Sequence, residues 1–451
     1  MNELRELRTA AREIFDDAIA AVDARRAVLD AVEFDGATLR VGDALFKLSA
    51  DAPRVYSVAL GKAAAAMASA LDERLGRALA GGVLSAPRSD FGLSGRWRVY
   101  EGGHPLPNAA SIEAARAAFE LLRAADGPGS LVLFLVSGGG SAMMELPRDP
   151  RLTLEDLREA NRVLVTCGAP IDEVNAVRRA LSAVKGGGLA SHASRAAQAT
   201  LIISDVATGR AYDVASGPTL AAPHDAPGVA ETVARYGLAS KLRGPVLRAL
   251  EEEGTHVPAQ PLPEARRTFH VLLDNAYACE AAVRAARGRG FAAEFARDVV
   301  EQHVEAGAAE LVSRLLTLHA REGARGVCLI SGGEFSCPVR GGGTGGRNSE
   351  TALRVAFEFE KVVAGRESRA GLVPAHAVAL CAGTDGIDGN SPAAGALADE
   401  TTTARARAQG LDARNFLDES DAHSLFDRLG DAINTGPTGT NVRDVRILLA
   451  V

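Results

Sequence analysis

The sequence features most suggestive of phosphate chemistry are two short loops in which glycines follow a run of apolar residues. The first, Ser137-Gly138-Gly139-Gly140-Ser141, comes directly after LVLFLV at 131–136. Its glycines allow backbone amides to converge on an anion, and its serine hydroxyls can donate to the same group. We therefore predict a phosphate-binding cradle, with a tight strand-to-helix turn as the structural alternative.

The second loop, Ser331-Gly332-Gly333-Glu334, follows VCLIS at 327–331 and adds a carboxylate to the same pattern. Gly332 and Gly333 again suggest contact with phosphate. Glu334 could face Mg²⁺ or cap the segment that follows, and the sequence does not choose between these roles.

Two cations stand beside such segments. Lys62 follows VYSVAL at 55–60 and immediately precedes a predicted helix, whose first amides and macrodipole favour anions. Arg347, followed by Asn348, comes after the glycine-rich segment 341–346, and a guanidinium there could stabilise charge on a transferring phosphoryl group. A solvated surface cation is the competing interpretation of each.

The same glycine-rich segment formally matches G-x-G-x-x-G through Gly341, Gly343 and Gly346. A dinucleotide site would require a strand before the glycines and an acidic residue at the end of a second strand about 20 positions later. Pro338 interrupts the preceding FSCPVR, and the acidic residues that follow fall inside a predicted helix. A glycine lid that presents Arg347 to phosphate fits the context better.

Carboxylates in three places could serve a metal ion or a proton transfer. Asp385 and Asp388 lie in GTDGIDG after AVALCA at 377–382, and a hard cation such as Mg²⁺ suits carboxylates so placed. A plain Asp-Gly turn is the alternative. Asp205 follows TLIIS at 200–204 and could act as a general base or as a metal ligand.

A polar segment, VNAVRRALSAVKGGGLA, contains Asn175, Arg178 and Lys185. Arg178 and Lys185 fall at helical spacing, with Ser182 between them, and could form a clamp for a carboxylate or phosphate. A solvated basic helix face is the alternative.

The elements that must position these residues form a repeating pattern of short apolar runs between alanine-rich stretches, which predicts an α/β protein with mainly parallel sheets. Each apolar run leads at once into one of the polar or glycine-rich loops. Because ligands of open α/β sheets bind at the carboxyl ends of the strands, we expect one or two clefts lined by these loops.

Composition narrows the class of protein further. The formal charge of −7 over 451 residues argues against nucleic acid as a partner, since such binding needs a basic face. No apolar run approaches the roughly 20 residues that span a bilayer, so no membrane segment is expected. Five cysteines without a CxxC pair indicate reduced thiols and a cytoplasmic location. The first 22 residues predict an amphipathic helix rather than a signal peptide.

Taken together and in order, nine strings of this sequence resemble the glycerate 2-kinase family with a C-terminal MOFRL domain. They are LGKAA, GGHPLPN, SGGGSA, VNAVRRALSAVKGGGLA, ISDV with ASGPT, SGGE, GGRN, GTDGIDG and TGPTGTNV. The resemblance implies ATP-dependent phosphorylation of the 2-hydroxyl of D-glycerate, with Mg²⁺. It also implies that Lys62 and Arg347 are the functional lysine and arginine.

The same resemblance implies three regions: a helical segment at 1–44, which could pack on the C-terminal domain, a Rossmann-like domain at 45–255 and a MOFRL-type domain at 265–451. The junction is expected in the proline-containing segment 235–268, and the active cleft between the two domains. Both a monomer and a homodimer remain open.

Several positions depart from the family pattern and leave the acceptor open to a related hydroxy acid. They are ATGRAYD at 207–213, Asn390-Ser391-Pro392, Ala180, Ser349 and Arg443. Two other functions compete with the kinase: a regulatory protein that binds a nucleotide or metabolite without catalysis, and a hydroxypyruvate reductase. The poor context of the G-x-G-x-x-G match weighs against the reductase.

Overall fold

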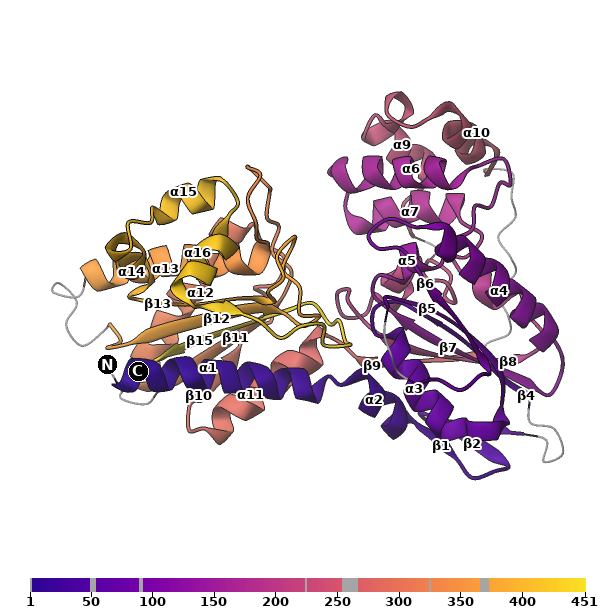
Figure 1. Cartoon of the computed structure of the whole chain (residues 1–451), viewed down its shortest axis with the longest axis horizontal. Helices are drawn as coiled ribbons and strands as arrows, with labels where there is room; N and C mark the ends of the chain where they lie inside the picture. Colours follow the sequence, from indigo (N-terminus) through magenta and orange to yellow (C-terminus); the bar gives the residue numbers. More distant parts are fainter. Residues whose placement is uncertain are drawn as a thin grey trace. The chain divides into compact units, whose positions relative to one another are not determined.

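The computed structural model describes residues 2–48, 54–88, 92–223, 225–253, 267–323, 326–365 and 373–451. The chain divides into two compact units (Figure 1). Unit 1 consists of Met1–Asp23 and Asp274–Val451, and unit 2 of Ala24–Leu273. Each unit has a central sheet of six strands. No helix in these described ranges is both long and apolar enough to cross a membrane.

The sheet of unit 2 is parallel throughout, as the apolar runs predict. Its strand order is β6-β5-β4-β7-β8-β9. The strands are β4 (Arg54–Leu60), β5 (Leu79–Ala86), β6 (Trp97–Glu101), β7 (Ser130–Ser137), β8 (Ala197–Ile203) and β9 (Arg267–Leu273). Every residue of β7 is buried, because helices cover both faces of a parallel sheet and its central strands have no solvent side.

The strand order contains a switch point between β4 and β7. From β4 the chain adds β5 and β6 on one side, then returns to add β7, β8 and β9 on the other. Right-handed crossovers therefore place α3 (Ala64–Leu75) and α4 (Ala109–Ala125) on opposite faces. α4 begins with a capping box between Asn108 and Ser111, and its alanine-rich face packs into the main core.

The rest of unit 2 is a helical layer and a small sheet. Helices α6 (Leu154–Thr166), α7 (Ile171–Leu181), α9 (Val229–Arg235) and α10 (Gly244–Glu253) share a separate apolar core. The small antiparallel sheet contains β1 (Val32–Phe34), β2 (Thr38–Val41) and β3 (Ala44–Lys47), next to α2 (Ala24–Ala31). Short helices are α5 (Gly140–Met143), α8 (Gly188–Ser191), η1 (Gly76–Ala78), η2 (Ala211–Ser216) and η3 (Leu238–Ser240).

The sheet of unit 1 corrects the expectation of a second mainly parallel sheet. Its order is β10-β11-β15-β12-β13-β14, and only β10 and β11 pair in parallel. Apolar runs reveal strands but not their direction. The last strand of the chain enters between β11 and β12 and runs opposite to both. The strands of this sheet are β10 (Ala292–Phe295), β11 (Val327–Gly333), β12 (Ala377–Gly383), β13 (Gly395–Asp399), β14 (Ala432–Ile433) and β15 (Asp444–Ala450).

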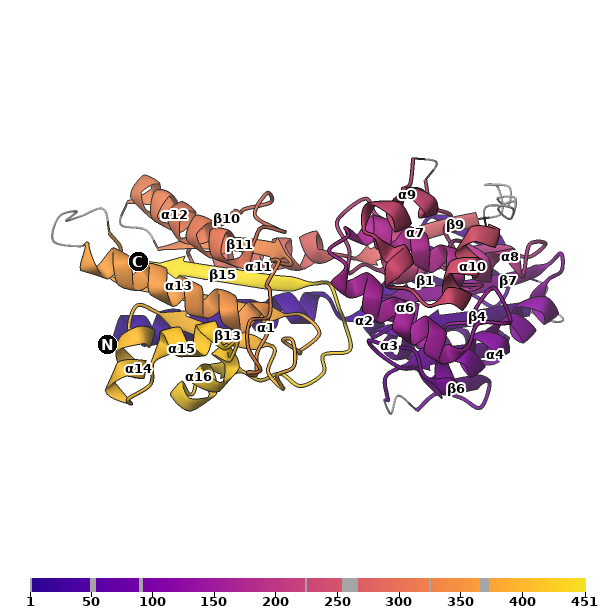
Figure 2. The same ribbon diagram turned by 90° about the horizontal axis from the view of Figure 1, so that it is seen from above.

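Helices cover both faces of this sheet. On one face lie α1 (Asn2–Ala21) and α11 (Asn275–Gly288), and on the other α12 (Val304–Glu322) and α13 (Arg347–Ala364). Figures 1 and 2 show α1 running alongside β15, with its predicted apolar stripe buried. The remaining helices, α14 (Thr402–Ala408), α15 (Ala413–Asp418) and α16 (Ala422–Leu429), form a cluster beside α13.

The compact units do not follow the predicted domain limits. The helix α1 belongs to unit 1, whereas residues 24–44 belong to unit 2, because α2 packs on α3 and β9. The strand β9, which was expected in the C-terminal domain, pairs with β8 and so also belongs to unit 2. Residues 254–266 of the expected junction segment 235–268 lie outside the described residues. The cleft expected between the two domains stays a prediction.

Candidate active site

The switch point of unit 2 brings Lys62 next to the loop Ser137–Ser141. The backbone amide of Lys62 donates to the carbonyl of Gly138 at 2.8 Å, and the amide of Ala63 donates to the Ser137 hydroxyl at 3.1 Å. The loops after β4 and β7 are thereby tied together where neighbouring crossovers leave in opposite directions. Ligands of open α/β sheets bind at this place.

Two further side chains gather around the same loop. Gly139 has a φ of +80°, which favours glycine, and a Cβ there would lie 3.1 Å from Cδ2 of His104 and 3.3 Å from Cγ of Lys62. A Cβ at Gly138 would overlap the carboxylate of Asp205. Lys62, Asp205 and His104 therefore surround the glycine loop. Sequence reasoning missed His104, although it stands in the motif GGHPLPN.

A chain of polar contacts runs from the glycine loop to α7. The hydroxyls of Ser141 and Ser216 lie 3.1 Å apart, and Ser216 donates to Oδ1 of Asn175 at 2.8 Å. Asn175 donates in turn to Asp213 at 3.1 Å, and Asp213 also accepts from Arg179 at 2.6 Å. Ser216 has a φ of +61°, a backbone conformation that costs about 1–3 kcal/mol outside glycine and is found at functional sites.

Lys185 is not on one helical face with Arg178, contrary to the prediction. The helix α7 ends at Leu181 because Ser182 adopts an extended conformation, so Lys185 lies beyond it. Lys185 is fully buried in an ion pair with Glu145. Burial lowers the pKa of Lys185, and the charge of Glu145 opposes this shift. Arg178 instead donates through Nε to Asn161 at 3.0 Å.

In unit 1, Arg347 lies at the end of the sheet where β11 and β12 terminate. It is the first residue of α13. Its Nε donates to Oδ2 of Asp444 at 2.6 Å and its Nη2 to Oδ1 at 3.1 Å, while Glu334 forms an ion pair with Nη2 at 2.8 Å. Burial by itself lowers the pKa of Arg347, but the charges of Asp444 and Glu334 outweigh it and raise this pKa.

Asp388 caps the helix that begins with Arg347, which argues against its predicted role as a metal ligand. Its carboxylate accepts from the amides of Asn348 at 2.9 Å and Ser349 at 2.8 Å, and from the Ser349 hydroxyl at 2.6 Å. The carboxylate is fully buried, and burial raises its pKa. Both oxygens are thus engaged in satisfying the first turn of α13.

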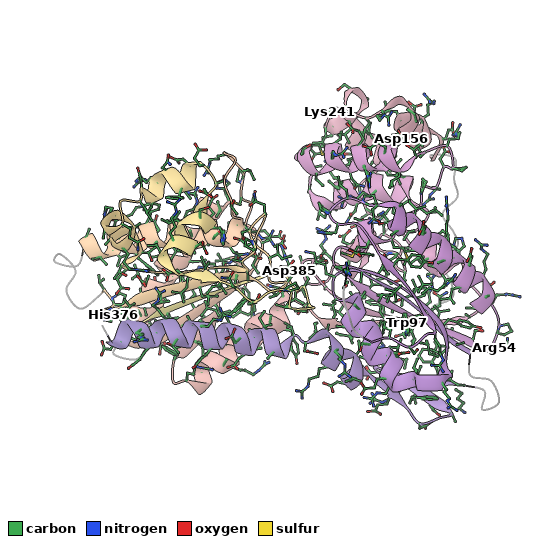
Figure 3. The ribbon with its side chains drawn as sticks, in the orientation of Figure 1. Arg54, Trp97, Asp156, Lys241, His376 and Asp385 are labelled. Carbon is green, nitrogen blue, oxygen red and sulfur yellow. The ribbon has the colours of Figure 1, made fainter. Side chains whose placement is uncertain are left out.

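The other predicted residues of unit 1 lie near the carboxylates that surround Arg347, namely Asp444, Glu334 and Asp388. The amide of Gly333 donates to Oδ1 of Asn275 at 2.8 Å, and Gly332 packs directly against the same side chain. A Cβ at Gly383 would lie 3.3 Å from Asp385 and 3.6 Å from the Asn348 amide nitrogen. Figure 3 shows Asp385 at this end of the sheet and His376 at the opposite end.

Sequence reasoning missed Asp444 and Asn275. The signal that could have found Asp444 is a carboxylate directly before the apolar run VRILLA, since a charge at the border of a buried strand needs a partner. Within the described ranges, no three histidine, cysteine or acidic side chains are grouped as a metal site.

The glycines that match G-x-G-x-x-G are used for packing. A Cβ at Gly341 would overlap Glu419, and one at Gly343 would overlap Asp421. The segment before α13 is irregular from Glu334 to Gly346 and contains no strand. This context does not provide the strand–turn–helix unit of a dinucleotide site.

Comparison with known proteins covers nearly the whole chain. Residues 10–251 match a domain of unknown function, DUF4147, and residues 327–444 match the MOFRL family. The chain is 33% identical to D-glycerate 2-kinase of Thermotoga maritima, over 91% of this chain and 94% of that protein. It is 34% identical to a putative hydroxypyruvate reductase of Agrobacterium vitis, over 98% and 94%.

A crystal structure of glycerate kinase from Thermotoga maritima has the same fold. It superimposes with a TM-score of 0.79 at 30% sequence identity, covering 99% of this chain and 100% of that one. Both sheets and the elements that carry the two residue clusters fall within this match. The chain therefore belongs to the glycerate 2-kinase family with a MOFRL domain.

Proposed function

We propose that this protein transfers the γ-phosphoryl group of ATP to the 2-hydroxyl of D-glycerate, giving 2-phospho-D-glycerate and ADP. The observation that carries the proposal is Arg347, a permanently charged guanidinium held by Asp444 and Glu334 beside a glycine-rich strand end. Such a group suits the charge that develops on the equatorial oxygens of a transferring phosphoryl group. Membership of the glycerate 2-kinase family supports the choice of substrate.

Each residue cluster has a role in this reaction. Lys62, the amides of Ser137–Ser141 and the Ser141 hydroxyl bind phosphate oxygens, and Arg347 stabilises the transition state. Asp205, beside Gly138, accepts the proton of the attacking hydroxyl. The new bond joins this oxygen to the γ-phosphorus, the bond from that phosphorus to the β-phosphate oxygen breaks, and ADP leaves.

The acceptor is bound by the polar chain that begins at Ser141 in this proposal. Asn175 and Arg178 are retained as contacts for a small hydroxy acid. Lys185 is removed from this set, since its buried pair with Glu145 leaves it a structural role. In unit 1, Gly332, Gly333 and Asn348 shape the surroundings of Arg347 through Asn275 and Asp444.

Mg²⁺ is the metal that ATP chemistry implies. It commonly keeps several waters and binds through one or two carboxylates together with substrate phosphates, so a protein-only cage is not needed. Asp385, whose Oδ1 accepts from the amide of Ile387 at 3.1 Å, is the carboxylate that would hold the ion, whereas Asp388 caps a helix and Glu334 pairs with Arg347. Bound with ATP, the ion would neutralise phosphate charge.

The test is ADP release with ATP, Mg²⁺ and a panel of D-glycerate, L-glycerate and related hydroxy acids, followed by phosphorus NMR of the product. Release that depends on D-glycerate, with phosphate at carbon 2, is expected. Tight ATP binding without ADP release would favour a regulatory binding protein. Oxidation of NADH with hydroxypyruvate would favour the reductase. The cytoplasmic location and the homodimer remain predictions.

A further inference from the structure

Arg347 is held by two carboxylates that differ in burial. Asp444 is almost completely buried, with 1% of its side chain exposed, and it meets Arg347 side-on through both oxygens. Glu334 is 36% exposed, and its Oε1 lies 2.8 Å from Nη2. A half-exposed pair exchanges readily with water or with an anionic ligand, whereas a buried bidentate pair does not. The orientation of Arg347 is therefore set by Asp444.

The position of Asp444 is itself fixed from three sides. It is the first residue of β15 and stands in register with Gly333 of β11 and Gly383 of β12. Asn275 donates to the Asp444 carbonyl at 2.9 Å. The side chain of Asn348 donates to Oδ1 of Asp444 at 2.9 Å, which fills the acceptor that also faces Nη2 of Arg347. The carboxylate thus starts from a rigid strand and has neighbours that prevent its rotation.

We propose that Asp444 is the positioning residue that aims the guanidinium of Arg347 at the transferring phosphoryl group, while Asp444 itself touches no substrate. This inference rests on the proposed kinase function. A guanidinium held through Nε and one Nη nitrogen by a fixed carboxylate presents its remaining N–H groups in a defined direction. Displacement of a catalytic group by about 1 Å can cost 10²-fold in rate, so orientation alone has a large effect.

The experiment is a double-mutant cycle of Asp444→Asn and Arg347→Ala. Asparagine keeps the shape of the side chain but offers a single acceptor oxygen. We expect Asp444→Asn to lower kcat by about 10²-fold while the KM values for ATP and D-glycerate change less than about threefold. In the Arg347→Ala background the same change should cost less than about threefold, because the residues act as a unit. Equal losses in both backgrounds would refute positioning.

Chemical rescue provides a second, independent measurement. Added guanidinium should restore part of the activity of Arg347→Ala by binding at the vacated carboxylate, and methylammonium should not, since it cannot bind bidentately. Rescue should vanish in the double variant. Rescue by both ions alike, or rescue that persists without Asp444, would overturn the proposal.

A spectroscopic readout separates this inference from the proposed function. The Nε–H signal of Arg347, identified by its loss in Arg347→Lys, should be protected from solvent exchange and should lose that protection in Asp444→Asn. This holds even if the protein phosphorylates no glycerate. The matched control is Asp399→Asn, which removes another buried carboxylate paired with arginines, at the opposite end of β12. It should leave the Arg347 signal and kcat unchanged; an unchanged signal in Asp444→Asn would contradict positioning.

Discussion

Both units carry a serine followed by two glycines at or near the end of a buried strand. Ser137 and Ser331 are both fully buried and tie their strand to a neighbouring loop: Ser137 accepts from the amide of Ala63 at 3.1 Å, and Ser331 donates to the carbonyl of Val299 at 2.6 Å. Neither hydroxyl is available to a ligand. The predicted donor role of the first serine therefore does not fit its bonding.

The glycines of the two turns are also alike. Gly138 packs against Asp205 and Gly332 against Asn275, so each glycine lies against a polar side chain from a distant part of the chain. The glycines that follow, Gly139 and Gly333, share a φ of +80°. The same short sequence thus lies beside a cation in unit 2 and beside a carboxylate network in unit 1.

The strand next to each turn explains this difference. In unit 2 the neighbours of β7 are parallel to it, so they contribute residues that follow strands, such as Lys62 and Asp205. In unit 1 the neighbour β15 runs the other way and contributes its first residue, Asp444. A functional edge of a mixed sheet therefore collects residues from strand beginnings as well as strand ends.

The largest change in kinetic constants should come from replacing Arg347 in unit 1 or Lys62 in unit 2, each in its own variant. We expect Arg347→Ala to reduce kcat by about 10³-fold, because a guanidinium on a transferring phosphoryl group contributes at least that much. Lys62→Ala should mainly raise the KM for ATP, since a phosphate-binding lysine acts in the ground state as well. Steady-state kinetics distinguish the two. Full turnover in Arg347→Ala would remove unit 1 from the mechanism.

The next largest effect tests whether the two turns are equivalent. Gly138→Ala would push the Asp205 carboxylate aside, and Gly332→Ala would displace Asn275. We expect each change to lower kcat/KM by about 10²-fold, with a stability loss of about 1–3 kcal/mol typical of overpacking. Activity and urea unfolding measure both effects.

The controls for these variants are Gly95→Ala in unit 2 and Gly288→Ala in unit 1, where a Cβ would meet no atom within 4 Å. Both controls should keep wild-type activity. If Gly332→Ala also behaved like a control, the parallel between the turns would be only geometric.

Much of the fold could be predicted because apolar runs and special loops are local signals. All five apolar runs named from the sequence fall in strands, and a helix follows each of Lys62 and Gly346, as predicted. The direction of β15 could not be predicted, since strand direction depends on pairing with distant segments. The parallel sheet expected for unit 1 was wrong for that reason.

Predictions for the site were limited in the same way. Residues directly after strands, such as Lys62 and Asp205, could be listed from spacing alone. Partners could not: nothing local shows that Lys185 is neutralised by Glu145 or that Asp388 is consumed as a helix cap. The type of a polar residue is the same whether its side chain faces a ligand or forms a hydrogen bond to a buried group. Only the tertiary contacts distinguish these two roles.

A smaller effect is expected from Glu334, the exposed partner of Arg347. Glu334→Gln should change kcat/KM by less than about fivefold, since a half-exposed ion pair contributes roughly 0–1 kcal/mol. The Mg²⁺ concentration for half-maximal rate should stay the same. In Asp385→Asn it should rise. A strong shift in the Mg²⁺ requirement of Glu334→Gln would restore Glu334 as a metal ligand and would make the two SGG turns functionally distinct.

The smallest effect concerns the pH dependence that buried carboxylates give to unit 1. Burial raises the pKa of Asp388 above its ordinary value of 3.8. Between that value and the folded pKa the folded state binds more protons than the unfolded state, so the free energy of unfolding falls as pH rises. Asp388→Asn removes this titration. The stability of the wild type relative to Asp388→Asn should therefore decrease from about pH 4 upward and level off above the folded pKa, as urea unfolding at several pH values can measure.

Asp399 provides the opposite sign within the same unit. Burial tends to raise its pKa, but the hydrogen bond from Thr401 and the charges of Arg8 and Arg405 outweigh it and lower the pKa. Its stabilisation is complete above 3.8 and is lost only as pH falls through the lower folded pKa. Relative to Asp399→Asn, the wild type should therefore show a constant advantage from pH 4 to 8 in urea unfolding. Parallel stability curves for both variants would mean that the pKa of Asp388 is not shifted in the opposite direction to that of Asp399. The carboxylate that caps α13 beside Arg347 would then titrate like the other buried carboxylates of unit 1.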